Sequence, residues 1–295
     1  MRTEAVVVTR GPYAPVLLDV RICFCIAALW LCANHCRSRA QAWNEFKARP
    51  DKQSENDFPG QARPFLPSLH ARSRHLTSFA NAQLPAEQLY CVFVLSDGGC
   101  DLESFELRDA AEARALLLQV ALSLAVAEEA CEFEHRDLHW GNVLLARAPC
   151  GPDEACHTLR GVRVAAATEG LAVTLIDFTL SRMTPRDRAG MAGPIAFCNL
   201  EDDPDIFKGP KGECQFETYR RMRRAVRADW AAYAPRTNAL WLHYLADVVL
   251  TAKQFPCDRA ERRALQAFRQ RCAEKHRSAS DAVTDELFAT MWRAL

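Results

Sequence analysis

The sequence has no net charge, because its 37 lysines and arginines balance its 37 aspartates and glutamates. A neutral chain has no overall field that would draw it to nucleic acid or to an acidic membrane surface. Its N-terminal apolar run, residues 22–33, is flanked by arginines and is shorter than the roughly 20 residues that a membrane span needs. We therefore expect a soluble globular protein with no direct nucleic-acid partner and no membrane partner.

Glycine is sparse before Gly98, and no G-x-G-x-x-G pattern occurs there, so a glycine-rich phosphate loop is not recognisable. The start of the chain has no secretory signal, and the 13 cysteines follow no regular framework. This usage predicts free thiols in a reducing compartment. One group could suggest a metal site, but its spacing fits no zinc module; it consists of Cys23, Cys25, Cys32 and Cys36.

The most informative stretch is HRDLHWGN at residues 135–142, between a long apolar helical run and a strand-like segment. An aspartate and an asparagine five residues apart, on a loop that leaves a helix, match the H-R-D-L-x-x-x-N pattern of protein-kinase catalytic loops. Phosphoryl transfer needs a carboxylate to accept the proton of the attacking hydroxyl and an oxygen ligand for the magnesium on the phosphates. Asp137 is therefore the candidate catalytic base, and Asn142 is a candidate metal ligand.

A second motif follows in the expected order. Apolar residues alternate through LAVTLIDFT at residues 171–179 and end at Asp177, as in a strand that leads to the metal-binding aspartate of a kinase. Thr179 stands where most kinases have glycine. Asp177 is thus the second candidate magnesium ligand.

Residues 133–145 and 176–182 closely resemble haspin, a family of atypical serine/threonine kinases of mitotic chromatin. Residues 123–128 and 241–245 resemble it as well, and the likeness runs from about residue 89 to about residue 250. It is specific, because His139, Trp140 and Thr179 are unusual among kinases in general. Ordinary serine/threonine kinases carry a lysine at the position of His139.

The resemblance implies an α+β, protein-kinase-like fold with ATP and Mg²⁺ as cofactors. It implies an incomplete, β-rich N-lobe in residues 1–95 and a mostly helical C-lobe in residues 96–295. The nucleotide would lie against the gatekeeper position, the hinge, a residue near the ribose and a catalytic-loop histidine. These positions are Leu95, then Ser96, Asp97 and Gly98, then Asp101, and finally His139.

The resemblance also implies a substrate. In the family, an acidic segment like residues 196–207 replaces the usual activation segment and grips a basic histone tail. Asp203 and Asp205 match its acidic positions, and Asp101 lies near the substrate as well. The implied reaction is phosphorylation of a threonine on the histone H3 tail in mitosis, by a monomeric enzyme in the nucleus on chromatin. Without the resemblance, the segment would read as a solvated acidic turn.

Residues 21–41 and 60–83 interrupt the family pattern in the N-terminal part. We interpret them as insertions with no counterpart in the fold, either sequence translated from unspliced introns or natural surface loops. Residues 6–20 are expected to be extended around a turn at residues 11–13, and residues 89–95 to form a buried strand.

Four helical segments and one loop are predicted in the second half. A buried helix should begin at Asp109, because apolar residues cover nearly all of its faces. Residues 216–226 and 237–252 should form helices, and the charged tail from Asp258 should be helical. Residues 150–168 contain polar residues and glycine and are predicted as an exposed excursion between two strands.

A complete kinase also needs a strand lysine that pairs with the phosphates and a helix glutamate that positions the lysine. Neither is recognisable, since Lys47 and Lys52 lie in a polar segment, and the chain is expected to begin after these elements. We therefore predict little or no activity for the chain as written. The main alternative is a non-catalytic pseudokinase that binds a basic peptide through its acidic segment. A small-molecule kinase of related fold is disfavoured by the haspin-like segments.

Overall fold

The computed structural model describes residues 3–10, 89–95, 97–147, 154–186 and 190–295. They belong to two compact units, residues 1–96 and residues 97–295, which are described separately. The two proposed insertions, the four N-terminal cysteines and Ser96 lie outside the described residues. The predicted boundaries of the two lobes and of the insertions stay predictions.

The N-terminal unit is described at one two-stranded antiparallel sheet. Strand β1 (Thr3–Arg10) pairs with β2 (Leu89–Leu95), and Val6 lies opposite Phe93. The register shifts between Thr3 and Ala5, at a bulge. Strand β1 is rich in β-branched residues, and β2 combines valines with aromatic residues; both kinds favour the extended backbone. The strand predicted at residues 89–95 is confirmed, and so is the extended structure expected from residue 6 as far as residue 10.

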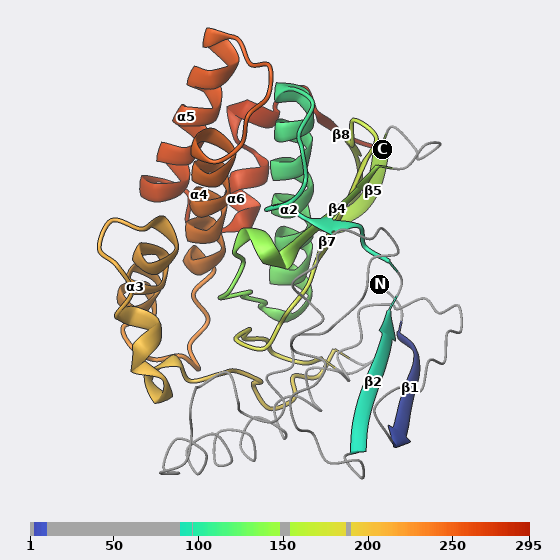
Figure 1. The fold of residues 1–295 in the computed structure, drawn as a ribbon, viewed down its shortest axis with the longest axis vertical. Helices are drawn as coiled ribbons and strands as arrows, with labels where there is room; N and C mark the ends of the chain where they lie inside the picture. The colour runs from blue at the N-terminus through green and yellow to red at the C-terminus, as the bar shows by residue number, and fades with distance from the viewer. Residues whose placement is uncertain (1–2, 11–88, 96, 148–153, 187–189) are drawn as a thin grey trace. The chain divides into compact units, whose positions relative to one another are not determined.

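The larger unit is built around α2 (Ala110–Cys131), which packs against α4 (Arg236–Thr251), α6 (Ala279–Val283) and β7 (Leu171–Leu175) and lies between the other helices and the strands of this unit in Figure 1. Asp109 caps its start by accepting a hydrogen bond from the Glu112 amide at 2.8 Å. Glu132 ends it in the left-handed conformation. The helix is long and apolar enough to cross a membrane, but 72% of its most apolar window is buried inside the protein. It is therefore a core helix, as its all-round apolar pattern predicts.

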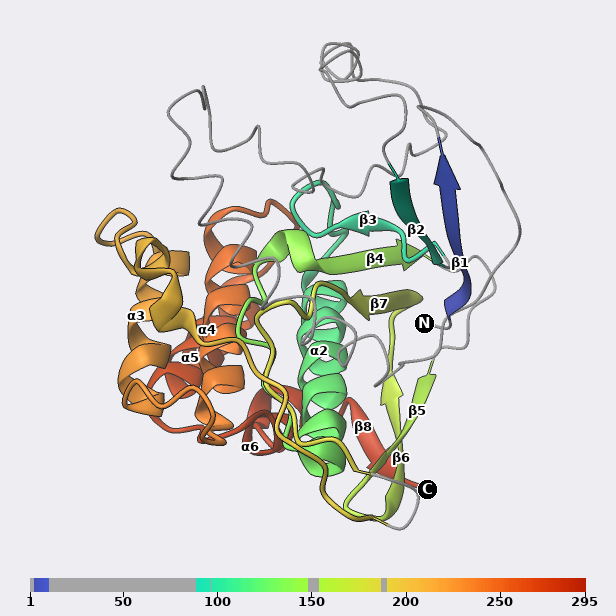
Figure 2. The same cartoon turned by 90° about the horizontal axis from the view of Figure 1, so that it is seen from below.

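A three-stranded antiparallel sheet lies beside α2 in Figure 2 and positions the two kinase motifs. Its order is β3 (Cys100–Asp101), β4 (Val143–Arg147) and β7 (Leu171–Leu175). Gly99 precedes it at a φ of 90°, and a Cβ there would lie 2.0 Å from the Leu145 carbonyl oxygen. Only glycine allows this close approach.

The second sheet corrects the expectation of an exposed excursion at residues 150–168. Strands β5 (Glu154–Leu159) and β6 (Val162–Ala167) form a hairpin, and β8 (Trp292–Ala294) pairs with β6. The apolar half of β6, residues 164–166, is buried. The prediction was wrong because three of the six residues of β5 are polar and because the partner strand β8 lies more than 120 residues later in the sequence than β6.

The remaining helices lie on the side of α2 that faces away from the sheets in Figure 1, and α4 and α6 contact it there. Helix α3 (Cys214–Val226), α4 (Arg236–Thr251) and α5 (Arg259–Glu274) confirm the three predicted helical segments within two residues at each shared end. Asp258 and Glu261 form a capping box at the start of α5. A short α6 (Ala279–Val283) then leads into the turn η5 (Glu286–Phe288).

Candidate active site

The two kinase motifs are joined at the end of α2. The chain leaves the helix at Glu132, and the next residues pair with the segment that follows Asp177. Two backbone hydrogen bonds of 2.9 Å connect Glu134 and Arg182 in both directions. The loop that carries Asp137 and the loop that carries Asp177 are therefore held together as one unit.

Arg136 anchors the catalytic loop to the protein interior. Its φ of 64° is in the left-handed region, which costs a non-glycine residue roughly 1–2 kcal/mol. The guanidinium is fully buried, pairs with Glu134 at 3.1 Å and donates to the Trp230 carbonyl at 2.7 Å. It also lies 5.3 Å from the centre of the Trp230 ring. These contacts hold the strained backbone in place, and they commit the arginine to a structural role.

Asp137 is half-buried, and its carboxylate has one strong partner. The phenol of Tyr219, on α3, donates a hydrogen bond to Oδ1. Burial raises the pKa of Asp137 from 3.8 to about 7; the Tyr219 hydrogen bond opposes this rise, and the charge of Asp177 adds to it. A carboxylate with a pKa near neutrality is suited to accept a proton at physiological pH.

Asn142 lies in the turn η2 (Trp140–Asn142), which is capped by His139. The Nδ1 of His139 accepts from the Gly141 amide at 3.1 Å. The side-chain Nδ2 of Asn142 donates to the Asp137 backbone carbonyl at 2.8 Å. The backbone carbonyl of Asn142 accepts from the Ile176 amide at 3.0 Å. Asn142 therefore links the candidate base to the residue before Asp177.

Asp177 is exposed and has a φ of 62°. Its Oδ1 accepts from the Thr179 amide at 3.2 Å and from the Thr179 hydroxyl at 2.7 Å. The threonine that replaces the usual glycine thus fixes the orientation of the aspartate. Sequence reasoning recognised Thr179 as unusual but assigned it no role.

The buried His135 side chain connects the loop of Asp137 to the loop of Asp177. Its Nε2 donates to the Ile176 carbonyl at 3.1 Å, while Nδ1 accepts from the Asp137 amide at 3.4 Å. Burial lowers the pKa of His135 from 6.5 to about 4, so the ring is neutral at physiological pH. The ring of Phe178 packs edge-on, 5.3 Å from His135 and 5.7 Å from Phe133. Both motifs therefore rest on one buried aromatic cluster.

The expected ribose-side residue lies next to this junction. Asp101 pairs with Leu144 in the register of β3 and β4, two residues after Asn142. The Leu102 amide donates to the carbonyls of Trp140 and Val143, at 3.2 and 2.8 Å. The structure thus brings Asp101 to the same edge of the sheet as the catalytic loop.

Lys253 fastens the same segment to the catalytic loop. Its Nζ donates to the carbonyls of Glu103 and Phe105, both at 2.8 Å, and lies 5.8 Å from the centre of the Trp140 ring. Asp97 and Gly98, of the expected hinge, precede this segment, and Asp97 accepts from the Gly99 amide at 2.9 Å. Leu95 ends β2 in the other unit, and Ser96 is outside the described residues.

The acidic segment forms two short turns, η3 (Leu200–Asp202) and η4 (Pro204–Phe207). It is fixed to α3 through Glu201, which receives two hydrogen bonds from Arg223, at 2.9 and 2.6 Å. The Trp230 indole donates to Glu201 at 3.1 Å. The two residues expected to bind substrate, Asp203 and Asp205, are both exposed. Asp205 pairs with Lys208 at 2.8 Å.

Sequence reasoning missed three residues that organise this region. Tyr219 reaches the candidate base, Arg223 holds the acidic segment, and Lys253 holds the segment after Asp101. The partners of each are 22 to 150 residues away in the chain. No local pattern marks such contacts. The arginines of α3 appear in the sequence only as a charged run.

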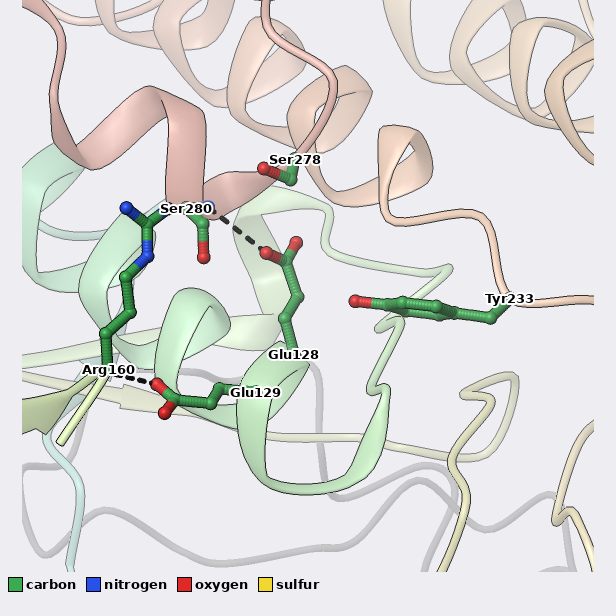
Figure 3. A pocket seen from close by; sticks show the side chains of 6 residues that line it. All are labelled: Glu128, Glu129, Arg160, Tyr233, Ser278 and Ser280. Carbon is green, nitrogen blue, oxygen red and sulfur yellow. Dashed lines mark hydrogen bonds between the residues drawn. The ribbon is translucent and has the colours of Figure 1, made fainter.

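A separate pocket, which Asp137 does not line, lies near the C-terminal end of α2 (Figure 3). Its buried carboxylate, Glu128, accepts from the amides of Ala279 and Ser280 at 2.8 and 3.1 Å and from the Asn238 side chain at 2.9 Å. Arg160 donates its amide to Glu129 at the rim. Glu128 is thus engaged in joining α2 to α4 and α6, which is a structural role.

Comparison with known proteins agrees with the motifs. A family model described as a haspin like kinase domain matches residues 64–283. The serine/threonine-protein kinase haspin homolog of Arabidopsis thaliana is 38% identical over 99% of this chain and 39% of its own length. Haspin of Bos taurus is 44% identical over 57% of this chain and 21% of its own length.

The chain belongs to the haspin-like kinase family. It is at family level a protein serine/threonine kinase with the predicted α+β, protein-kinase-like fold. The mouse relative, also named serine/threonine-protein kinase haspin, is 40% identical over 65% of this chain and 24% of its own length. The chain thus spans well under half the length of these curated relatives. Kinases of this family generally use ATP and a divalent metal.

The donor set fits such a metal. Asn142 uses its amide nitrogen on the Asp137 carbonyl, which leaves the amide oxygen for a ligand. Asp177 uses Oδ1 on Thr179, which leaves Oδ2. Among the described residues no cluster of three or more His, Cys, Asp or Glu side chains could hold a metal alone. Two oxygen ligands that share the ion with phosphates and water are typical of Mg²⁺.

Proposed function

We propose that residues 97–295 form the catalytic unit of a kinase that transfers the γ-phosphoryl group of ATP to a threonine of the histone H3 tail. The observation that supports this most strongly is the environment of Asp137. Its carboxyl group has a pKa near 7, its backbone is bound by Asn142, and Asp177 is close enough to influence its charge. A proton acceptor and two metal-binding oxygens at one junction are the parts that phosphoryl transfer requires.

In the proposed mechanism, Asp137 takes the proton of the threonine hydroxyl through Oδ2, because Oδ1 is engaged by Tyr219. Asn142 and Asp177 would hold Mg²⁺ through their remaining oxygens. ATP supplies the phosphoryl group, and the metal supplies positive charge that stabilises the phosphate oxygens. Asp97, Gly98, Asp101 and His139 of this unit would contact the nucleotide, and the family resemblance adds Leu95 and Ser96 as expected contacts.

The substrate assignment is supported by the exposed carboxylates of the acidic segment. Asp203 and Asp205 have no role in the core and offer charge to a basic peptide, with Asp101 as a further contact. A histone tail is such a peptide. We propose accordingly that the protein acts in the nucleus on chromatin, as a monomer that does not itself bind nucleic acid.

We expect the chain as written to turn over slowly, since its sequence contains no recognisable glycine-rich loop or phosphate-binding lysine. Loss of such groups lowers rates by orders of magnitude. The test is a long incubation of the purified chain in excess over a histone tail peptide, with ATP and Mg²⁺ and with Asp137→Asn as the control. We expect slow labelling of the threonine that requires Asp137.

Labelling that persists in Asp137→Asn would contradict the proposed role of Asp137. A complete absence of labelling would leave the second candidate, a non-catalytic module that binds a basic peptide. The missing lysine favours that candidate, and the retention of Asp137, Asn142 and Asp177 together disfavours it. Peptide binding that requires Asp203 and Asp205, without labelling, would establish it.

A further inference from the structure

The contact between Tyr219 and Asp137 joins the catalytic loop to a helix that lies 82 residues further along the chain. Tyr219 is only 4% exposed. Its ring packs edge-on against Trp241 of α4, with the ring centres 5.4 Å apart. The core therefore fixes the Tyr219 side chain in the position from which its hydroxyl contacts Asp137.

We propose that Tyr219 is a positioning residue, which holds Oδ1 of Asp137 so that Oδ2 faces the substrate hydroxyl. This inference rests on the proposed function, because it assigns a task to the proposed base. The described residues provide no hydrogen-bond donor for Oδ2, whereas Oδ1 has Tyr219. A carboxylate fixed at one oxygen can rotate little, so the free oxygen points in a defined direction.

The phenol acts only as a donor. Burial raises the pKa of Tyr219 well above its usual value, and the neighbouring carboxylate of Asp137 raises it further. The tyrosine therefore keeps its proton at neutral pH. The hydroxyl proton of the substrate passes to Oδ2 of Asp137, and the Tyr219 proton stays on its own oxygen.

Helix α3 couples this contact to the acidic segment. Tyr219 and Arg223 are four residues apart and lie on the same face of the helix, where Arg223 holds Glu201 at 2.6 Å. Between them, Arg220 donates to the carbonyls of Phe207 and Gly209, at 2.9 and 3.0 Å. One helix thus positions both the proposed base and the proposed substrate segment.

The test compares the full chain with its Tyr219→Phe variant, in which the ring remains and the hydroxyl is lost. Aspartate carboxyls are labelled with ¹³C and titrated by NMR, and Asp137→Asn identifies the signal. Since the phenol stabilises the ionised carboxylate, Tyr219→Phe should raise the pKa of Asp137 by about one unit, a tenfold change in its proton affinity. The control is Tyr233→Phe, which removes a half-buried phenol near Arg182 and should leave the pKa unchanged.

An unchanged or lowered pKa of Asp137 in Tyr219→Phe, with an unchanged melting temperature, would overturn the proposal. This titration needs no turnover, so it separates the role of Tyr219 from the kinase function. Where labelling of the peptide is measurable, Tyr219→Phe should lower kcat more than about fivefold at pH 7, with KM for the peptide unchanged. About fivefold of this loss comes from the raised pKa and should be recovered at higher pH, whereas the remainder comes from the lost orientation of Oδ2 and should persist there. Full recovery of kcat at high pH would show that Tyr219 changes only the pKa of Asp137, and a changed KM or melting temperature would indicate a general structural role. Either result would overturn the proposal.

Discussion

The catalytic loop and the acidic segment differ in how they are held. Residues 135–142 are anchored in the protein interior by two of their own side chains, Arg136 and His135, which are both fully buried. The segment at residues 199–207 is held to α3 by Glu201 and by the Phe207 carbonyl, which accepts from Arg220, and it leaves Asp203 and Asp205 in solvent. A group that takes a proton needs a fixed position and a low dielectric, whereas residues that meet a flexible charged peptide need exposure. We therefore expect changes in the loop to affect folding and chemistry, and changes in the segment to affect peptide binding alone.

The largest effect should come from Glu134→Ala, which leaves Arg136 charged and unpaired inside the protein. Both side chains are 0% exposed, and removing one partner of such a pair costs about 3–5 kcal/mol of the free energy of unfolding. Chemical denaturation measures this. The matched control is Arg293→Ala. The side chains of Arg293 and its partner Glu154 are 58% and 46% exposed, so loss of this pair should cost less than about 1 kcal/mol of the free energy of unfolding. Equal losses in the two variants would show that the buried pair beside the catalytic loop contributes no more than an exposed pair, and would contradict this prediction.

The second effect concerns the pH dependence of stability. The pKa of Asp137 is about 7 in the folded state against 3.8 for an unperturbed carboxyl, so the folded protein retains a proton that the unfolded chain releases. Wild-type stability should therefore contain a term that falls between about pH 4 and pH 7. Asp137→Asn lacks this term, so its stability relative to wild type should be higher at pH 8 than at pH 4, by at most about 4 kcal/mol.

Denaturation of the two proteins at both pH values checks this prediction. The difference between them isolates Asp137 from His135, whose lowered pKa of about 4 acts in the opposite direction. A buried neutral histidine loses stability as the pH falls from about 6.5 towards 4. A difference between wild type and Asp137→Asn that is the same at pH 4 and pH 8 would contradict the raised pKa.

A smaller effect is expected at Thr179. Thr179→Val keeps the shape of the side chain and removes the hydroxyl that holds Asp177 at 2.7 Å. Loss of one such hydrogen bond, about 1 kcal/mol, should raise the Mg²⁺ concentration needed for half-maximal labelling roughly fivefold. Thr179→Ser retains the hydroxyl and should behave like wild type. If the serine variant is impaired as much as the valine variant, the hydroxyl does not orient Asp177.

The smallest effect should come from the acidic segment. Arg223→Ala releases Glu201 and should raise KM for the peptide about threefold to tenfold, or about 0.7–1.4 kcal/mol, with little change in the melting temperature. Arg224→Ala removes the neighbouring exposed arginine of α3 and serves as the control. A large loss of stability in Arg223→Ala would show that the segment is part of the core and would break the comparison.

The sequence marked the candidate residues of the site but not the distant contacts around them, and the roles of those residues stay predictions. Asp137, Asn142 and Asp177 are recognisable because phosphoryl transfer fixes their spacing within two short motifs, and the helices from Asp109 onwards follow from their apolar periodicity. The sheet of β5, β6 and β8 was missed because β8 lies more than a hundred residues from its partner. Tyr219 and Lys253 were missed for the same reason, since their contacts depend on how distant elements pack.

The central claim is that Asp137 is a proton acceptor whose pKa lies close to neutrality. The most direct measurement is the rate of peptide labelling under single-turnover conditions as a function of pH, for wild type and Asp137→Asn. The account predicts that the wild-type rate rises as Asp137 ionises, with an apparent pKa near 7, and that this rise is absent in Asp137→Asn. A wild-type rate that does not change between pH 5.5 and pH 8.5, which extends about 1.5 units on either side of that pKa, would contradict it.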